Sequence, residues 1–240
     1  WVYSSPAVAN GVVYVGGGGY PYYNVYALDA STGALLWSYL TGDSLSSSPA
    51  VANGVVYVGA DDHNVYALKA TTGALLWSFT TGWNVYSAPA VANGVVYVGS
   101  GDGYVYALNV STGAKLWSYG AGGVYSSPAV ADGVVYVGSD NAKVYALKTA
   151  TGAKLWSYAT GSYVDSSPAV ANGVAYVGSY DGNVYALNAK TGAKLWGYPT
   201  GSYVDSSPAV ANGVVYVGSD DNNVYACLLY TSPSPRDRQK

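Results

Sequence analysis

Glutamate and methionine are absent from this 240-residue chain, and glutamine occurs once, near the end. These residues are strong helix formers, whereas the abundant valine, tyrosine and tryptophan favour pleated strands. The sequence therefore predicts an all-β fold with almost no helix. No apolar run approaches the roughly 18 residues that a membrane-spanning helix needs, so we expect no membrane span in this segment.

Cysteine and arginine are also scarce. Cys227 is the single cysteine, so no disulfide can form within the chain. Both arginines, Arg236 and Arg238, lie in the last five residues, and before residue 227 twelve aspartates outnumber seven lysines. An acidic body without arginine is a poor match for the phosphate backbone of nucleic acids, so we expect no nucleic-acid partner.

What the chain does contain is a repeat of about 40 residues. The string Pro-Ala-Val-Ala-Asn/Asp-Gly-Val-x-Tyr-Val-Gly begins at Pro6, Pro49, Pro89, Pro128, Pro168 and Pro208. Asn-Gly pairs between short β-favouring runs are typical of two-residue hairpins. Each unit thus reads as four strands, A to D, and four strands per unit of this length indicate a propeller blade. The sequence predicts a β-propeller of about six four-stranded antiparallel blades, with repeats starting near residues 1, 44, 84, 123, 163 and 203.

The position of each strand within a blade follows from side-chain size. We expect strand A over Ser-Pro-Ala-Val-Ala, with its small alanines innermost, where the blades converge. A second string, Thr-Gly-Ala-x-Leu-Trp, places a bulky tryptophan in strand D, which suits the wide outer gap between blades. These tryptophans are Trp37, Trp77, Trp117, Trp156 and Trp196.

This second string, with the residues before it as in Ala27–Trp37, resembles the tryptophan-docking motif of the quinoprotein, or PQQ-type, propellers. The resemblance implies that each docking tryptophan packs between neighbouring blades. Propellers of that family usually have seven or eight blades. Two alternatives therefore stay open: a fragment of a seven- or eight-bladed ring, or six blades that close as they stand.

The repeat stops after Ala226, in the middle of a blade. Residues 227–240 resemble a translated sequencing adapter. We therefore expect one propeller domain over residues 1–226 and a non-native tail over residues 227–240, either disordered or filling the open edge of the sixth blade. The chain begins inside a repeat, at Trp1, so a signal peptide or lipid anchor is not visible.

The resemblance also implies an enzymatic alternative, a quinone-dependent dehydrogenase. Such enzymes hold the quinone over a calcium ion with Glu, Asn and Asp side chains, yet this chain has no glutamate, and its short connections leave no long loops to wall a cofactor. His63, the single histidine, lacks partners for a zinc site or a catalytic triad. We expect no enzyme, no catalytic residue, no metal and no cofactor; a dehydrogenase fragment lacking its active site is the alternative.

One face of the predicted disc is acidic and aromatic. The D–A and B–C connections of a propeller emerge on the same face, and in this chain they carry ten aspartates against one lysine, Lys143. Aromatic rings beside carboxylates suit protein hot spots or stacked sugar rings. The candidate binding face comprises Trp83, Tyr86, Tyr104, Tyr125, Tyr163, Asp165, Tyr180, Tyr203 and Asp205.

Together these features favour a non-enzymatic member of the family. We expect a protein-interaction scaffold in the cell envelope or outside the cell, similar in kind to the propeller lipoprotein of the outer-membrane β-barrel assembly machinery, with a protein partner not identified by the sequence. A carbohydrate-binding surface module is the alternative from a different class.

Overall fold

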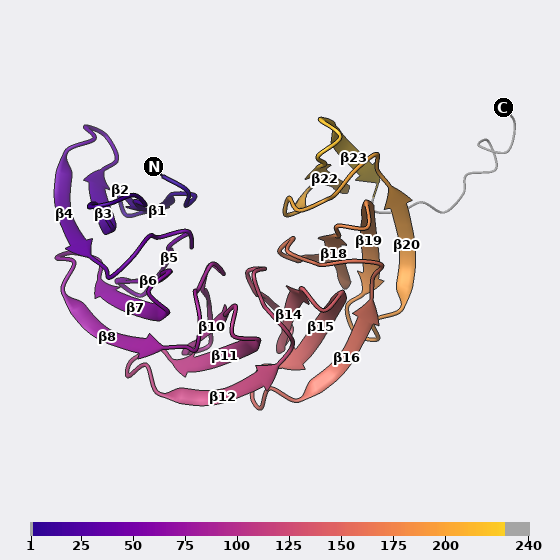
Figure 1. The fold of residues 1–240 in the computed structure, drawn as a ribbon, viewed down its shortest axis with the longest axis horizontal. Coiled ribbons are helices and arrows are strands. Elements are labelled where there is room, and N and C mark those ends of the chain that lie inside the picture. The colour runs from indigo at the N-terminus through magenta and orange to yellow at the C-terminus, as the bar shows by residue number, and fades with distance from the viewer. Residues whose placement is uncertain (1, 229–240) are drawn as a thin grey trace, which may run out of the picture.

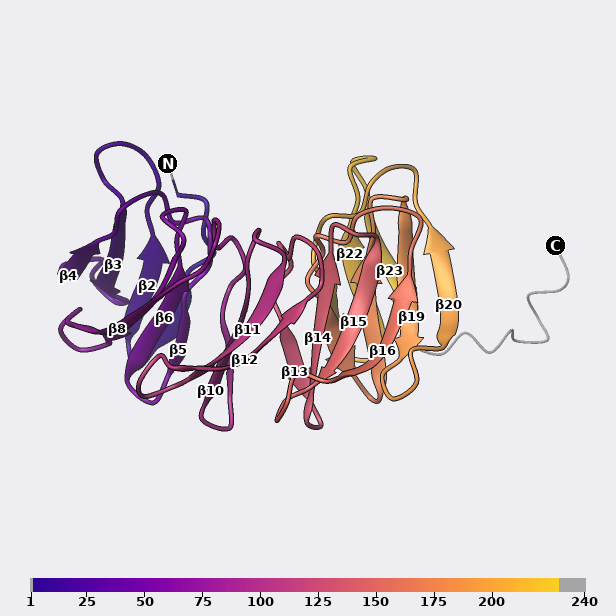
Figure 2. The same ribbon diagram turned by 60° about the horizontal axis from the view of Figure 1, so that its bottom comes forward.

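The computed structural model describes residues 2–228, and these contain strands and turns but no helix. None of the described segments is therefore a helix that could cross a membrane. The strands form six separate antiparallel sheets, five with four strands and the last with three. The sheets follow one another along the chain as the blades of a propeller (Figures 1 and 2). The predicted all-β propeller of about six blades is confirmed.

The strands run in chain order from the inside of each blade to the outside. Blades 1 to 3 contain β1 (Ala7–Ala9), β2 (Val12–Gly16), β3 (Asn24–Asp29) and β4 (Leu35–Leu40); β5 (Ala50–Ala52), β6 (Val55–Gly59), β7 (Asn64–Lys69) and β8 (Leu75–Thr80); β9 (Ala90–Ala92), β10 (Val95–Gly99), β11 (Tyr104–Asn109) and β12 (Lys115–Gly120). Blades 4 to 6 contain β13 (Ala129–Ala131), β14 (Val134–Ser139), β15 (Lys143–Lys148) and β16 (Lys154–Ala159); β17 (Ala169–Ala171), β18 (Val174–Gly178), β19 (Asn183–Asn188) and β20 (Lys194–Pro199); β21 (Ala209–Ala211), β22 (Val214–Gly218) and β23 (Val224–Leu228).

The hairpin between the two inner strands of each blade has the expected turn. In blade 1, Asn10 and Gly11 both have positive φ, 51° and 76°, as the two central residues of a type I′ turn require. Ala9 pairs with Val12 directly across this turn. The Asn-Gly pair therefore fixes the register that places alternate valines on opposite faces of the sheet.

The innermost strand is shorter than predicted, with three residues where the sequence suggested five. The proline before it has no N–H to donate to the ladder. A serine hydroxyl continues the pairing instead: in blade 3 the Gly99 N–H donates to Ser87 Oγ over 3.0 Å. The same contact recurs at Gly16 with Ser4, and at Gly138 with Ser126.

Neighbouring blades are joined by the tryptophan of strand D. The Trp77 indole N–H donates to the Val110 carbonyl of the next blade over 3.0 Å, and the Tyr57 hydroxyl donates to the same oxygen. The indole ring also lies against Gly113, where an added Cβ would approach Trp77 Cδ2 to 2.7 Å. Equivalent indole bonds run from Trp37 to Ala70, Trp117 to Thr149 and Trp156 to Ala189.

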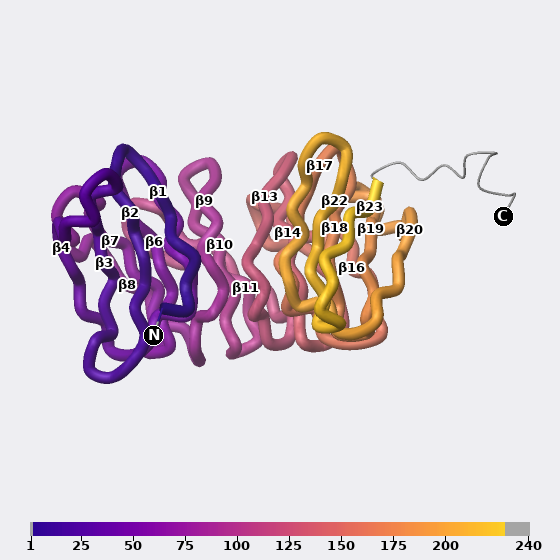
Figure 3. The backbone as a smooth tube through the Cα atoms, turned by 90° about the horizontal axis from the view of Figure 1, so that it is seen from above, coloured from indigo at the N-terminus to yellow at the C-terminus, as the bar shows by residue number. Residues whose placement is uncertain are grey.

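The six blades form an open arc and not a ring. Neighbouring inner strands contact one another in the order β1, β5, β9, β13, β17 and β21, and they line the concave side of the arc (Figures 1 and 3). Blades 1 and 6 face each other across the opening (Figure 1). Closure of the six blades as they stand, one of the two alternatives, is therefore wrong. Of the expected tail, residues 227–240, the first two residues, Cys227 and Leu228, belong to β23. The rest, from residue 229 onward, lies outside the described residues.

Candidate functional site

The D–A connection of each blade meets the B–C turn of the next on one face of the arc, called here the acidic face. Between blades 2 and 3, the Gly82 N–H donates to Asp102 Oδ2 over 2.6 Å, and the Gly101 N–H donates to the Asn84 carbonyl over 3.0 Å. Both connections are therefore held together by hydrogen bonds to each other, which gives this face a fixed backbone.

Some aspartates of the acidic face are structural braces. Asp102 Oδ2 also accepts from the Tyr106 hydroxyl over 2.7 Å, and its Oδ1 accepts from the Tyr104 N–H over 3.0 Å. Asp62, Asp181 and Asp221 accept the equivalent glycine and tyrosine hydrogen bonds. The hydrogen bond from the Tyr225 hydroxyl, together with the others, lowers the pKa of Asp221 to about 2. These carboxylates thus already accept hydrogen bonds from within the fold.

Sequence reasoning counted these aspartates as surface charge and missed their bracing role. A signal for it was present, because an aspartate precedes a strand C tyrosine by four residues in four blades, as in Asp62 with Tyr66. In blade 4 Asn141 takes this position, and its amide donates to the Tyr145 hydroxyl. The recurring four-residue spacing indicates a contact between the two side chains.

The centre of the candidate site is a row of three tyrosines. The Tyr180 ring stacks on Tyr203, with ring centroids 5.3 Å apart and an interplanar angle of 14°. The Tyr163 ring also lies next to Tyr180, with ring centroids 6.3 Å apart and an interplanar angle of 46°. Tyr163 and Tyr203 are each 54% exposed. The D–A connections of two successive blades and the B–C turn between them thus present aromatic faces to solvent.

Carboxylates surround this tyrosine row. Burial raises the pKa of Asp165, and the charges of Asp140 and Asp205 raise it further. Asp165 Oδ1 is buried and accepts no hydrogen bond from any described residue. Burial, the charge of Asp165 and the hydrogen bond to it raise the pKa of Tyr180 to about 12. The carboxylates of Asp140, Asp165 and Asp205 therefore concentrate negative charge at this end of the face. The charges that shift the pKa values of Asp165 and Tyr180 include no lysine.

A second aromatic group lies beside the first. The rings of Tyr86 and Tyr125 are 5.7 Å apart, and burial together with the charges of Asp140 and Asp165 raises the pKa of Tyr125. Trp83 belongs to the same group, because Gly101 lies under both Trp83 and Tyr125: its Cβ would approach their rings to 2.7 and 3.3 Å. A side chain at position 101 would therefore displace this group.

The nine candidate residues do not form a single cluster. Trp83 stacks on the His63 ring, with centroids 5.6 Å apart and an interplanar angle of 18°. Tyr104, at the start of β11, packs against Tyr106 at 6.0 Å, away from the tyrosine row of blades 5 and 6. The structure thus brings together eight of the nine candidate residues in two neighbouring groups and leaves Tyr104 in a separate contact.

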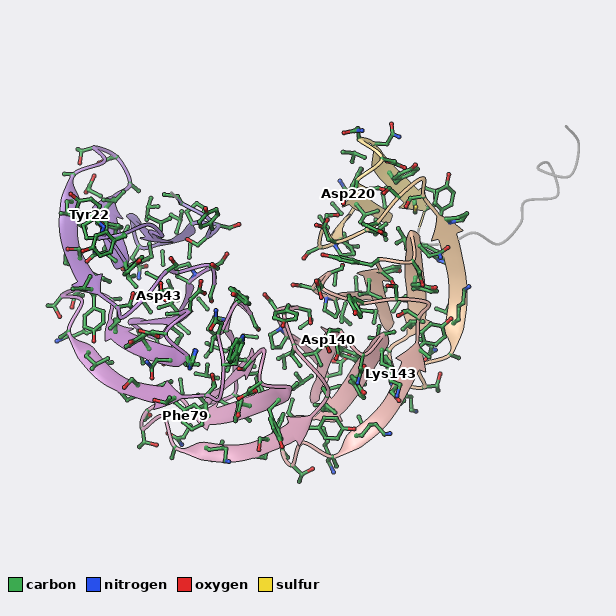
Figure 4. The ribbon with its side chains drawn as sticks, in the orientation of Figure 1. Tyr22, Asp43, Phe79, Asp140, Lys143 and Asp220 are labelled. Atoms are coloured by element: carbon green, nitrogen blue, oxygen red, sulfur yellow. The ribbon has the colours of Figure 1, made fainter. Side chains whose placement is uncertain are left out.

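The charge on the acidic face extends along the arc. Figure 4 places Asp43, Asp140 and Asp220 in three different blades toward its concave side, with Lys143 farther out than Asp140. Within residues 2–228, Lys143 is the one lysine at this end of the strands, and ten aspartates occupy its connections. The face therefore favours a cationic ligand over an anionic one.

Two hollows lie on the described part of the chain at or near the acidic face and at its last blade. One, of about 150 Å³, lies beside the tyrosine row and is lined by Tyr180, Asp181, Gly182, Thr200, Gly201, Ser202 and Tyr203. The other, of about 320 Å³, lies between β20 and β23 and is mostly apolar, lined by Trp196, Gly197, Tyr198, Tyr225, Ala226, Cys227 and Leu228. The first is shallow and polar, as suits an exposed side chain of a partner.

Comparison with known proteins agrees with this architecture. The family model described as outer membrane protein assembly factor BamB matches residues 22–126 and 120–232. BamB from Moraxella catarrhalis is 21% identical with a TM-score of 0.83, over 95% of this chain and 70% of that one. The computationally designed protein Ika8 is 22% identical with a TM-score of 0.84, over 94% and 70%. No curated protein sequence matches the chain.

An enzyme of the same fold is also similar. The quinohemoprotein alcohol dehydrogenase ADHIIG from Pseudomonas putida HK5 is 22% identical with a TM-score of 0.74, and the match covers 91% of this chain but 51% of that one. At such identities the likeness to solved structures concerns the fold alone. In the described part of the chain no three His, Cys, Asp or Glu side chains are grouped so as to hold a metal ion. The residues present do not fit a quinone held over calcium.

Proposed function

Because the chain belongs to the family of the outer membrane protein assembly factor BamB, we propose that it is a non-enzymatic scaffold of the cell envelope. In this proposal it binds another protein through the acidic face. The family match and the likeness to BamB from Moraxella catarrhalis support a protein partner and an envelope location. The short, hydrogen-bonded connections of the face support recognition by a fixed surface.

The observation that carries the proposal is the tyrosine row with its uncompensated carboxylates. Tyr163 and Tyr203 offer exposed ring faces, and Asp165 retains a buried oxygen without a hydrogen-bond donor. A lysine or arginine of a partner would pair with the exposed carboxylate of Asp205, beside Asp165, while its apolar stem packs on the rings. Complementary charge of this kind also accelerates association and makes it sensitive to salt.

The first prediction concerns this contact. A fluorescent decapeptide of alternating arginine and leucine should bind the chain, and the same peptide with glutamate in place of arginine should not. Tyr203→Ala and Tyr163→Ala should each weaken binding by roughly tenfold, because an exposed aromatic anchor contributes about 1–3 kcal/mol. Fluorescence anisotropy at low and high salt measures both effects, and affinity should fall as salt rises.

Tyr22→Ala is the matched control. Tyr22 is 67% exposed and lies in a B–C turn of the same face at the other end of the arc (Figure 4). Affinity that is unchanged in Tyr163→Ala and Tyr203→Ala would rule out the tyrosine row as the binding site. Equal losses in Tyr22→Ala and Tyr203→Ala would indicate non-specific attraction to the whole acidic face.

Carbohydrate binding is the second candidate. Trp83 is 55% exposed and its ring is held nearly parallel to His63, so one indole face is presented flat, as sugar stacking requires. A soluble oligosaccharide such as maltohexaose would then quench the Trp83 fluorescence, and Trp83→Phe would remove the quenching. The protein-scaffold proposal expects no change of fluorescence with the sugar.

A further inference from the structure

The face opposite the acidic face, called here the basic face, holds the A–B hairpins and the C–D turns of the blades. Among residues 2–228 it carries six lysines against two aspartates, Asp29 and Asp132. Five of these lysines belong to blades 3 to 5, namely Lys115, Lys148, Lys154, Lys190 and Lys194. All five are exposed, and none of them forms an ion pair with a carboxylate of the described residues. The positive charge of this face is therefore free to pair with an anionic ligand.

The outer strand of these blades also exposes a leucine beside a lysine, because it contains a β-bulge. In blade 4, Leu147 pairs with Lys154 and Ala146 pairs with Trp156, so Leu155 is the extra residue between them. Neighbouring side chains of a regular strand point to opposite faces, but a bulge re-aims them. Lys154 and Leu155 are accordingly both exposed, whereas Trp156 is buried. The bulge thus presents a cation and an apolar group to solvent side by side.

The same pair recurs in the two adjoining blades. Lys115 with Leu116 occupies the bulge in blade 3, and Lys194 with Leu195 occupies it in blade 5. The leucines of the three pairs are 51–52% exposed. Blades 3 and 4 lie in the middle of the arc, so the exposure of their pairs does not arise at an end of the chain. The strands that begin with these pairs, β12, β16 and β20, follow one another along the convex side of the arc (Figure 1). Three lysine–leucine pairs therefore form a curved row at the rim of the basic face.

We propose that this row binds the surface of an anionic lipid bilayer. The phosphate headgroups would pair with the lysine ammonium groups, and the leucines would enter the boundary between headgroups and acyl chains. The apolar stems of the lysines can pack along that boundary while the charges stay at the level of the headgroups. A repeated pair of side chains requires a repeated ligand, and the headgroups of a bilayer supply one at every point. A nucleic acid would pair with the lysines but would leave the leucines in water.

This contact would fix the orientation of the arc on the bilayer. The basic and acidic faces lie at opposite ends of the same strands, since the lysine Lys148 and the lysine Lys143 are the two ends of β15. Anionic headgroups would attract the first face and repel the second. The acidic face would then point away from the lipid. The inference goes beyond the proposed partner binding, because it concerns different residues on the opposite face.

Co-sedimentation of the full chain with lipid vesicles tests the proposal. The chain should bind vesicles of phosphatidylglycerol mixed with phosphatidylcholine, should bind vesicles of phosphatidylcholine alone much less, and should be released by salt. Lys148→Gln and Lys154→Gln should each lower the partition coefficient about fivefold, which is the contribution of one lysine near an anionic surface. Leu155→Gln should also weaken binding but leave its salt dependence unchanged, because it removes an apolar contact and no charge.

Lys143→Gln is the matched control for Lys148→Gln. Both lysines are exposed end residues of β15, and each substitution removes one positive charge, but Lys143 lies at the acidic end of the strand. Lys143→Gln should therefore bind vesicles as the parent does. Arg236, Arg238 and Lys240 are present in every variant, so the comparison between variants cancels their contribution. Circular dichroism checks that each variant is folded.

Three results would overturn the proposal. They are equal losses in Lys143→Gln and Lys148→Gln, vesicle binding that Leu155→Gln leaves unchanged, and a chain that binds duplex DNA but not anionic vesicles. Tyr203→Ala, which tests the acidic face, should bind vesicles as the parent does. Failure of the bilayer contact is thus distinguishable from failure of the proposed partner binding.

Discussion

At the scale of single residues, the acidic face contains two kinds of aspartate with opposite pKa shifts. Hydrogen bonds from Tyr225 and neighbouring amides lower the pKa of Asp221 to about 2. Burial, with smaller contributions from the charges of Asp43 and Asp62, raises the pKa of Asp61 to about 6. The charged form of Asp221 therefore stabilises the folded state. The charged form of Asp61, which has a buried oxygen without a hydrogen-bond donor, destabilises it.

This difference predicts a pH dependence for Asp61. Its pKa is higher in the folded chain than in the unfolded one, so the folded state binds the proton more tightly and stability falls as pH rises from about 4 to 6. Asp61→Asn keeps the shape and removes the charge. At pH 7 it should raise the free energy of unfolding by on the order of 1 kcal/mol after allowance for solvent screening, and at pH 4 by much less. Urea unfolding at the two pH values measures this.

Asp221→Asn is the comparison of opposite sign. A lowered pKa contributes stability that is present above about pH 4 and is lost as pH falls toward 2. Asp221→Asn should therefore destabilise the chain at pH 7 and have little effect near pH 2. The same sign of effect for both variants at pH 7 would contradict the assignment of the two environments.

The sequence predicted which aspartates lie on one face but not which of them are braces. Turn composition places Asp102 and Asp165 in connections of the same face. Whether a carboxylate is occupied depends on which backbone amide reaches it, and for Asp102 that amide belongs to Gly82, twenty residues away. This contact depends on how successive blades stack, which turn composition does not encode.

At the scale of elements, the glycine of the C–D turn is where the preceding blade docks. Gly152 has φ of 69°, and its Cβ would approach Trp117 Cε3 to 2.6 Å. Gly173, in an A–B hairpin, has φ of 74° but no atom within 4 Å. The two glycines share a left-handed conformation, and one of them is also covered by an indole ring.

These two glycines separate docking from backbone strain. Gly173→Ala should cost about 1–2 kcal/mol for the left-handed conformation alone. Gly152→Ala should cost a further 1–3 kcal/mol or so, because the methyl group would push the Trp117 ring off its platform. Urea unfolding of both variants gives the difference. Equal losses would mean that the tryptophan contact contributes little to stability.

The elements were largely predictable, because their signals are local. Asn-Gly turns and alternating valines are enough to place the hairpins and strands of every blade. The innermost strand was predicted too long, because backbone pairing begins only after the proline that precedes it, as at Pro89 before Ala90. The serine two residues before that proline, such as Ser87, reaches the partner strand only through its side chain. There the hydroxyl oxygen accepts the hydrogen bond that a backbone carbonyl would accept within a strand.

At the scale of the whole molecule, the sequence predicted the strands of each blade but not whether the six blades close into a ring. Identical blades can stack into six-, seven- or eight-bladed arrangements, since the repeat fixes each contact and the number of blades in a turn depends on a small angle between sheets. The arc of Figure 1 results from that angle. The tryptophan contacts that transmit it, such as Trp77 with Val110, recur at Trp37, Trp117 and Trp156.

The open arc also means that blades differ in how many neighbours they have, although their sequences hardly differ. Blades 2 to 5 are covered on both faces, and blades 1 and 6 on one. In a stack whose stability is a sum over nearest neighbours, opening should begin at the ends. Amide hydrogen exchange in dilute solution should then be slowest in β10 and β14 and at least about tenfold faster in β2 and β22. Equal protection in all six blades would contradict it. Blades of nearly the same sequence would thus differ in amide exchange only through their position in the arc, with exchange spreading from the two end blades toward the middle.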